Sequence, residues 1–228
     1  MKTMWLQHLQ LLDSALPIGA FSHSFGLESL VQSGCIRSLD NLREYSQNML
    51  FNSWATCDAM AIKGVYQFAP QQRWNELWQL DRMIHLNRSA RESREGAQKM
   101  GKRLLQLGQS LHPDVEWNPL LEAVAAQKCI GCHSTVYGWA TCHLQVPQRN
   151  AVEGYLYSCV TSCVNNAVRL MSIGQTQAQT LVAQMLPDIA EAWHHIANRD
   201  PFDFATSTPM LEVAAMQHET LYSRLFMS

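Results

Sequence analysis

The stretch AVEGYLYSCVTSCVNNAVRLM, residues 151–171, decides the fold class of this 228-residue chain. Its larger apolar side chains recur every three or four residues, as they do along one face of a helix. These side chains are Leu156, Val160, Val164, Ala167 and Met171. The wider region between Cys129 and Pro187 carries only three formal charges, which are Arg149, Glu153 and Arg169. A helix with so few charges is surrounded by other helices or by a partner protein.

The rest of the chain is also predicted to be helical. Further helical patterns cover Thr3–Leu12, the stretch from Ser38 or Asp40 to near Pro70, Arg73–Leu111 as one or two helices, and about Pro209 to Arg224. No segment shows the period-two alternation of a strand, and no long low-complexity linker divides the chain. We therefore expect an all-α fold, with residues 1–228 forming a single domain. It would be a helical bundle of roughly eight to ten helices with no significant sheet.

The composition excludes several classes of protein. The formal net charge is −2, with 47% hydrophobic and 16% charged residues, which argues against binding to nucleic acid or to a membrane surface through bulk positive charge. The N-terminus lacks the features of a signal peptide, and no run of eighteen apolar residues predicts a transmembrane helix. Seven cysteines without an export signal are expected to be reduced thiols in the cytoplasm.

Residues 11–30, LLDSALPIGAFSHSFGLESL, interrupt the helical pattern with a loop rich in polar side chains. Pro17 and Gly19 force the chain out of a helix, and Gly26 lets it enter the next one. The side chains expected to be displayed on this rigid loop are Phe21, Ser22, His23 and Ser24. Polar groups beside one aromatic ring form a plausible patch for binding a partner protein.

Two other interpretations of this loop stay open. His23 next to a serine suggests a base and a nucleophile, with Glu28 nearby, but adjacent side chains rarely meet in hydrogen-bonding geometry and no third orienting group can be named. Alternatively, the loop is a simple turn in which Ser22 or Ser24 caps the next helix and Glu28 lies near its positive end. We favour binding over catalysis.

The stretch GAQKMGKR, residues 96–103, nearly matches a phosphate-binding loop. That loop needs a preceding strand and a final serine or threonine hydroxyl for magnesium. Here the last residue is Arg103 and the surrounding sequence predicts a charged helix, so nucleotide binding at this position is rejected.

The stretch CIGCH, residues 129–133, could supply metal ligands. Together with Cys142 and His143, the residues Cys129, Cys132 and His133 offer thiolate and imidazole groups for Zn²⁺ or Ni²⁺. Structural zinc sites, however, use two well-spaced pairs of ligands, and a free cysteine commonly packs as a small core residue. We favour packing, and a cytoplasmic metal-binding or redox protein remains the alternative.

Four stretches together resemble one family. They are LLDSALPIGAFSHSFGLES, SARESREGAQKMGKRLL, NNAVRLMSIGQTQAQ and PMLEVAAMQHETLYSRLFMS, in this order along the chain. On a helical chain of this length, they closely resemble the F-type urease accessory protein (UreF) family. The resemblance covers essentially the whole chain and is loosest at about 50–85 and 105–150. The CIGCH thiols fall in that looser part and belong to no signature of the family.

The resemblance implies a maturation factor that is not itself an enzyme. Members of the family are all-helical, form homodimers and bind the D-type (also called H-type) urease accessory protein. They then recruit the G-type accessory GTPase, which carries nickel, so that Ni²⁺ reaches apo-urease. The family member acts as scaffold and adaptor and holds no cofactor of its own. Modulation of the partner GTPase is a further possibility that the resemblance raises.

The resemblance and the residue chemistry together nominate candidate site residues. Those expected to bind partner proteins are Phe21, Ser22, His23, Glu28, Tyr222, Arg224 and Phe226, the last three because tyrosine, arginine and phenylalanine favour binding interfaces. Those expected to have a structural role or to border a channel are Arg169, Gln175 and Gln179. Arg169 lies in an almost uncharged helix, so burial would be costly unless it finds a carboxylate, backbone carbonyls or a polar channel.

Overall fold

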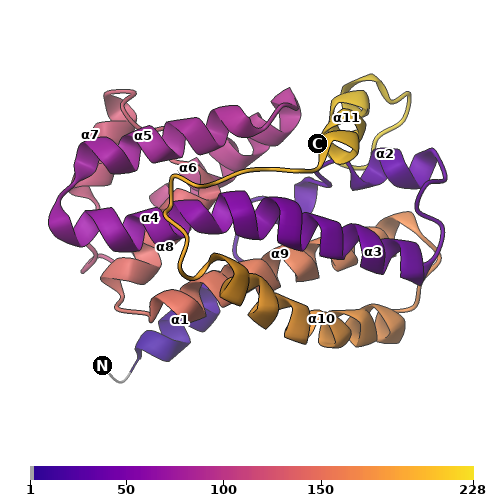
Figure 1. The fold of residues 1–228 in the computed structure, drawn as a ribbon, viewed down its shortest axis with the longest axis horizontal. Helices are drawn as coiled ribbons and strands as arrows, with labels where there is room; N and C mark the ends of the chain where they lie inside the picture. The colour runs from indigo at the N-terminus through magenta and orange to yellow at the C-terminus, as the bar shows by residue number, and fades with distance from the viewer. Residues whose placement is uncertain (1–2) are drawn as a thin grey trace.

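The computed structural model describes residues 3–228, and helices dominate them (Figure 1). The α-helices are α1 (Met4–Leu12), α2 (Leu27–Gln32), α3 (Leu39–Met49), α4 (Ala59–Phe68), α5 (Trp74–Asn87), α6 (Arg91–Leu111), α7 (Asn118–Ala125), α8 (His133–His143), α9 (Gln148–Leu170), α10 (Gln175–Ile196) and α11 (Pro209–Gln217). Short 3₁₀ turns cover Ala20–Ser22, Ala69–Gln71 and His218–Thr220. No strand occurs in residues 3–228, so the prediction of an all-α fold is confirmed.

A continuous helical rod crosses the middle of the molecule (Figure 1). It consists of α3, the π-helical segment Leu50–Asp58 and α4. Of the two caps that the sequence offered, Ser38 and Asp40, it is Ser38 that caps the start, because its hydroxyl accepts a hydrogen bond from the Asn41 backbone N–H at 3.2 Å. The rod ends at Phe68, just before Pro70, where a proline interrupts helical hydrogen bonding.

The linker that joins α10 to α11, residues 197–208, runs across this rod (Figure 1). Backbone N–H groups of Ala205 and Ser207 donate to the carbonyls of Thr56 and Asn52 at 2.9 and 3.0 Å. Both carbonyls belong to the π-helical segment, whose wider turns leave backbone groups available to neighbours. The irregular segment and the linker therefore satisfy each other's backbone groups.

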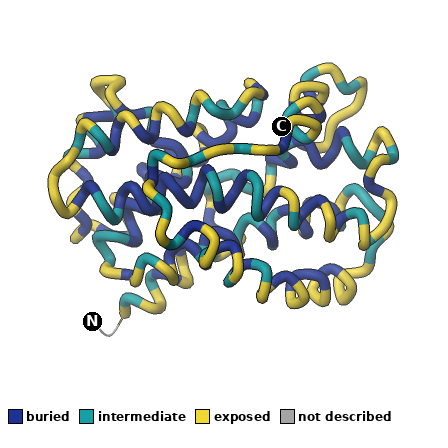
Figure 2. The backbone as a smooth tube through the Cα atoms, in the orientation of Figure 1, coloured by how far each residue is buried: buried dark blue, intermediate teal, exposed yellow. Residues whose placement is uncertain are grey.

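The hydrophobic core lies between the rod and helices α8 and α9 (Figure 2). The predicted apolar stripe of α9 is buried at Leu156, Val160, Val164 and Ala167, which confirms that other helices cover it. Along α10 the burial colours alternate, with one side turned inward and the other exposed (Figure 2). The charge-poor helices thus occupy the interior, and the more polar faces cover them.

The structure decides between the one and the two helices predicted for Arg73–Leu111, and it ends the last helix earlier than predicted. The stretch from Arg73 to Leu111 forms two helices, α5 and α6, with a break at residues 88–90. The last helix was expected to continue to Arg224, but α11 ends at Gln217. The reason is a tertiary contact. The N–H groups of Leu225 and Phe226 donate to the Glu28 carboxylate of α2 instead of to the carbonyls of a preceding helical turn.

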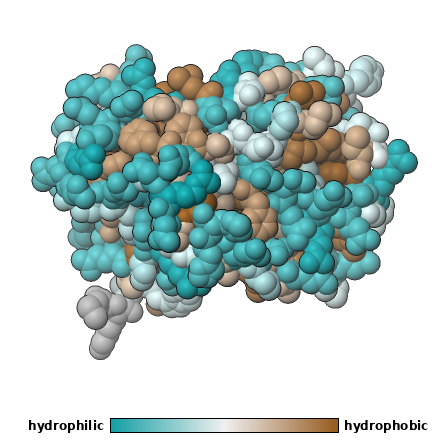
Figure 3. Space-filling view, in the orientation of Figure 1, coloured by the Kyte–Doolittle hydropathy of each residue, from teal (hydrophilic) through white to brown (hydrophobic). Residues whose placement is uncertain are grey.

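The surface is largely hydrophilic on the face seen in Figure 3, with hydrophobic patches between the polar side chains. None of the helices in residues 3–228 is both long enough and apolar enough to span a bilayer. Several large apolar side chains are nevertheless exposed on short elements near the two ends of the chain. They include Trp5, Leu6, Phe21, Met210 and Tyr222.

Candidate functional site

The loop between α1 and α2 takes its shape from left-handed backbone positions. Gly19 has φ +85° and Gly26 has φ +93°, a region that glycine adopts without steric cost. At Gly26 a second constraint applies, because an added Cβ would lie 3.0 Å from the backbone nitrogen of Ala215 in α11. Gly26 therefore permits both the turn into α2 and the close approach of α11.

The last eight residues, Leu221–Ser228, which we call the tail, lie against this loop. The Met227 N–H donates to the Ser22 carbonyl at 2.8 Å, and the Phe25 N–H donates to the Ser228 carbonyl at 3.0 Å. The Ser228 hydroxyl is 2.7 Å from His23 Nδ1. Segments about 200 residues apart in the sequence therefore form one continuous surface.

The buried carboxylate of Glu28 holds the tail in place through hydrogen bonds. Glu28 is 1% exposed and each of its carboxylate oxygens has two hydrogen-bond partners. Oε1 accepts from the Leu225 N–H at 2.7 Å and from Gln32, and Oε2 accepts from the Phe226 N–H at 3.1 Å and contacts His218 at 3.0 Å. Burial opposes ionisation, but these hydrogen bonds outweigh it and hold the pKa of Glu28 below its usual value. A carboxylate with all four lone-pair positions occupied is a structural anchor and has none left for proton transfer.

His218 and Glu92 complete this anchor. Nδ1 of His218 lies 2.7 Å from Glu92 Oε2, and Nε2 of the same ring faces Glu28. The other oxygen of Glu92 accepts from the Arg224 guanidinium at 2.8 Å. Glu28 comes from α2, Glu92 from α6 and Arg224 from the tail, so the cluster joins three parts of the fold.

The prediction that the loop exposes four side chains is wrong for two of them. His23 is 6% exposed and Ser24 is equally buried, whereas Phe21 is 65% exposed and Ser22 lies between these extremes. Burial lowers the pKa of His23, with Lys99 adding to the effect and Glu92 opposing it, so the ring is neutral at pH 7. The loop therefore presents an aromatic ring and hides its imidazole under the tail.

The tail residues also divide into exposed and buried. Tyr222 is fully exposed and Arg224 is partly exposed, but the Phe226 ring is buried at 4% exposure. Glu28, grouped with them as a partner-binding candidate, is buried as described above. The surface available to a partner thus includes Phe21, Tyr222 and the edge of Arg224, together with the exposed apolar side chains of Leu225 and Met227.

Arg169 links the loop to the tail. Its guanidinium donates to the Phe21 carbonyl at 2.9 Å and lies 4.5 Å from the centroid of the Phe226 ring, a cation–π distance. The expected cost of burying this charge does not arise, because Arg169 is exposed near the end of α9. Gln175 and Gln179 occupy exposed positions in the first turns of α10.

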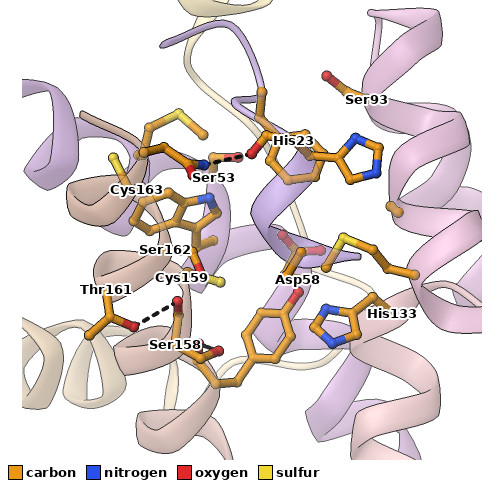
Figure 4. A pocket seen from close by; sticks show the side chains of 18 of the residues that line it. His23, Ser53, Asp58, Ser93, His133, Ser158, Cys159, Thr161, Ser162 and Cys163 are labelled. Atoms are coloured by element: carbon orange, nitrogen blue, oxygen red, sulfur yellow. Dashed lines mark hydrogen bonds between the residues drawn. The ribbon is translucent and has the colours of Figure 1, made fainter. Parts of the chain in front are cut away.

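Behind the loop lies a cavity of about 130 Å³ (Figure 4). His23, Asp58, Arg88 and His133 are among the residues that line it. Arg88 and Asp58 form a buried ion pair. Burial disfavours the charged guanidinium, but the Asp58 carboxylate outweighs it and keeps the pKa of Arg88 above its usual value. Burial and the neighbouring guanidinium lower the pKa of His133 to about 4, so its ring is neutral.

The CIGCH stretch wraps around Asp81 of α5. The Asp81 carboxylate accepts from three successive backbone N–H groups, those of Ile130, Gly131 and Cys132, at 2.6 to 3.1 Å. The Cys129 thiol donates at 3.1 Å, and the hydroxyl of Thr135 in α8 donates at 2.6 Å. The carboxylate thus sits at the positive end of α8, where a negative charge is stabilised.

This arrangement separates the candidate metal ligands. Cys129, Cys132 and His133 lie at one end of α8, and Cys142 and His143 at the other, about 14 Å away at 1.5 Å per residue. Burial and the Asp81 carboxylate raise the pKa of both the Cys129 and the Cys132 thiol, which opposes formation of the metal-binding thiolate. In the described part of the chain, no three His, Cys, Asp or Glu side chains are grouped to hold a metal ion.

Comparison with known proteins agrees with the resemblance seen in the sequence. A family profile described as UreF matches residues 36–186. A urease accessory protein UreF from Lachnoclostridium phytofermentans is 34% identical over 98% of both chains. Those from Paenarthrobacter aurescens and Bacillus sp. (strain TB-90) are 33% and 32% identical over 96% and 98% of this chain and 96% and 98% of their own. The chain belongs to the UreF family.

All four stretches that carry the UreF resemblance meet at the loop and the tail. The first contributes the loop itself and the last contributes the tail and His218. The second contributes Glu92 from α6, and the third contributes Asn166 and Arg169 from α9. Asn166 donates to the His23 carbonyl at 2.7 Å. In this member of the UreF family, the most recognisable parts of the sequence therefore build one site.

Several residues of the site were missed by reading the sequence. They are Asp58, Asp81, Arg88, Glu92, His218 and Ser228. A partial signal existed for Asp58, which stands alone among apolar residues in the run ATCDAMAI, residues 55–62. A single charge on an apolar helix face indicates a buried partner, although it does not say which residue that partner is.

Proposed function

We propose that this protein is a scaffold for the maturation of urease. In this proposal it binds the D/H-type accessory protein, recruits the G-type GTPase and so allows nickel carried by that GTPase to reach apo-urease. The chain makes or breaks no bond, needs no cofactor of its own and works as a homodimer. Any effect on GTP hydrolysis would come from binding the GTPase.

The convergence of the four UreF-like stretches on one rigid surface carries this proposal. Their backbone is fixed by Glu28, Asn166 and Arg169, yet the surface that they form leaves the Phe21 and Tyr222 side chains exposed. Exposed aromatic side chains on a rigid backbone lose little conformational entropy when a partner covers them. The surface therefore suits binding.

The same geometry argues against an active site built on His23 and Glu28. His23 Nδ1 faces the Ser228 hydroxyl, and the Glu28 oxygens are fully engaged by the tail and His218. Neither group is free to act on a substrate without first releasing the tail. The chain's relatives named urease accessory proteins also support a role beside urease.

The test is capture of the GTPase by a purified complex of this protein with the D/H-type accessory protein. Tyr222→Ala and Arg224→Ala are each expected to weaken capture about 10- to 30-fold, the effect of a binding hot spot of roughly 1.4 to 2 kcal/mol. Leu186→Ala, which truncates an exposed apolar side chain on α10, is the matched control and should bind normally. Wild-type capture by both tail variants would refute the assignment of this surface.

Two further measurements test the wider proposal. A strain that lacks the gene should make urease subunits that contain no nickel, and normal urease activity without added nickel would contradict the role. Light scattering after size exclusion should give the mass of two chains.

The metal-binding alternative is weakened by the length of α8 between its candidate ligands and by the raised pKa of the Cys129 and Cys132 thiols. Equilibrium dialysis with Ni²⁺ and Zn²⁺ would nevertheless separate the two proposals. Tight stoichiometric binding that Cys132→Ser abolishes, together with unaffected capture of the GTPase by the tail variants, would support a metal protein instead.

A further inference from the structure

We infer that His218, with both ring nitrogens protonated, is a latch that fastens the tail, and that loss of one proton releases it. The inference concerns the tail's attachment and holds whether or not the proposed partners bind there. It makes the loop–tail surface dependent on pH.

The contacts of the ring require both protons. Nδ1 lies 2.7 Å from Glu92 Oε2 and Nε2 lies 3.0 Å from Glu28 Oε2, and the ring is fully buried. Ionised carboxylates only accept hydrogen bonds, and a neutral imidazole has a single N–H. Both contacts are therefore satisfied only by the imidazolium ion.

The charges around the ring balance only in that form. Glu28 from α2 and Glu92 from α6 supply two negative charges, and Arg224 from the tail and the His218 imidazolium supply two positive ones. The adjacent Glu219 is already paired with Arg91 at 2.8 Å on the surface. Loss of the proton leaves an uncompensated negative charge and points a ring lone pair at a carboxylate in a buried site, which is unfavourable.

The carboxylates of Glu28 and Glu92 also hold the tail, so the repulsion between them and a neutral His218 ring weakens the attachment of the tail directly. Glu28 accepts the Leu225 and Phe226 N–H groups, and Glu92 accepts the Arg224 guanidinium. A carboxylate that turns away from a neutral ring gives up these contacts. Release would also remove the Ser228 contacts from the loop that forms one wall of the cavity.

Hydrogen exchange of the tail amides tests the latch. The protection of the Leu225 and Phe226 amides, corrected for the chemical exchange rate, should fall at least tenfold between pH 6 and pH 9. His218→Gln should show low protection at every pH. His195→Gln, which removes an exposed histidine beside Glu191, is the matched control and should behave as the wild type. His23 does not contribute over most of this range, because burial lowers its pKa and it is already neutral.

Glu92→Gln keeps the test decisive if His218→Gln fails to fold. The new amide can donate to an unprotonated Nδ1, so the protection of the tail should change with pH less than threefold, although loss of the Arg224 pair lowers it overall. Amides of the buried helix α4 should keep constant corrected protection in every variant, which separates local release from unfolding. Constant protection of the wild-type tail from pH 6 to 9, or wild-type pH dependence in His218→Gln, would overturn the inference.

Discussion

Replacing Asp81 by alanine should destabilise the fold more than any surface change, because one buried carboxylate organises the whole CIGCH stretch. Three backbone N–H groups, the Cys129 thiol and the Thr135 hydroxyl would lose their acceptor. A buried donor left without a partner costs about 1–3 kcal/mol. Some of these donors would be satisfied by water entering the space left by the carboxylate. We therefore expect a loss of about 3–5 kcal/mol, as for breaking a buried charged contact.

Urea and thermal unfolding followed by circular dichroism measure this loss. For a chain of this size, 1 kcal/mol corresponds to about 2–4 °C in Tm, so Asp81→Ala should lower Tm by about 6–20 °C. Asp114→Ala is the matched control, because Asp114 is exposed and should change the free energy of unfolding by less than about 0.5 kcal/mol. A loss below about 1 kcal/mol for Asp81→Ala would refute the structural role given to this carboxylate.

Three further predictions rest on buried groups elsewhere. The pKa of His133 is about 4 in the fold, below its value in the unfolded chain, so the unfolded chain binds more protons between pH 4 and 6.5. The free energy of unfolding should therefore rise by up to about 3 kcal/mol as the pH increases across that window. Urea titrations at several pH values should show this rise in the wild type and its loss in His133→Phe. Gly101→Ala places a Cβ against the Gly131 carbonyl and should lower Tm by about 4 °C or more, whereas unchanged stability would contradict the close packing of α6 on α8. Lys63 donates to the carbonyl of Ile196, the last residue of α10, and to those of Ala197 and Arg199 just beyond it, so Lys63→Met should cost about 1–3 kcal/mol in urea unfolding, and fraying of the end of α10 should be visible by hydrogen exchange.

The Gly101 contact also explains the near match to a phosphate-binding loop. Both glycines of GAQKMGKR lie within α6, where no strand precedes them. An added Cβ on Gly96 would come within 3.0 Å of His23 Nδ1, and one on Gly101 would meet the backbone of the CIGCH stretch. Their spacing reflects where two other segments approach one helix, and the helix predicted around them is confirmed.

The opening loop shows the limit of sequence reasoning at a site. Its break from helix and its glycines were predictable, because backbone conformation depends on local residues. The burial of His23 and Glu28 was not, since the tail that covers them lies nearly 200 residues away in the sequence. The prediction of exposure depends on the polarity of these side chains, and a polar side chain is compatible with burial once hydrogen-bond partners are present.

The sequence by itself determined the helical class, a helix start at Ser38 or Asp40, the buried stripe of α9 and membership of the UreF family. These depend on periodicity, local hydrogen bonds and motif order, all of which are written along one segment at a time. Only the tertiary structure decided that Glu28 and Asp81 are anchors and that Arg169 is exposed. The role of a charged side chain depends on which distant N–H groups, rings or ions surround it, and only folding places them there.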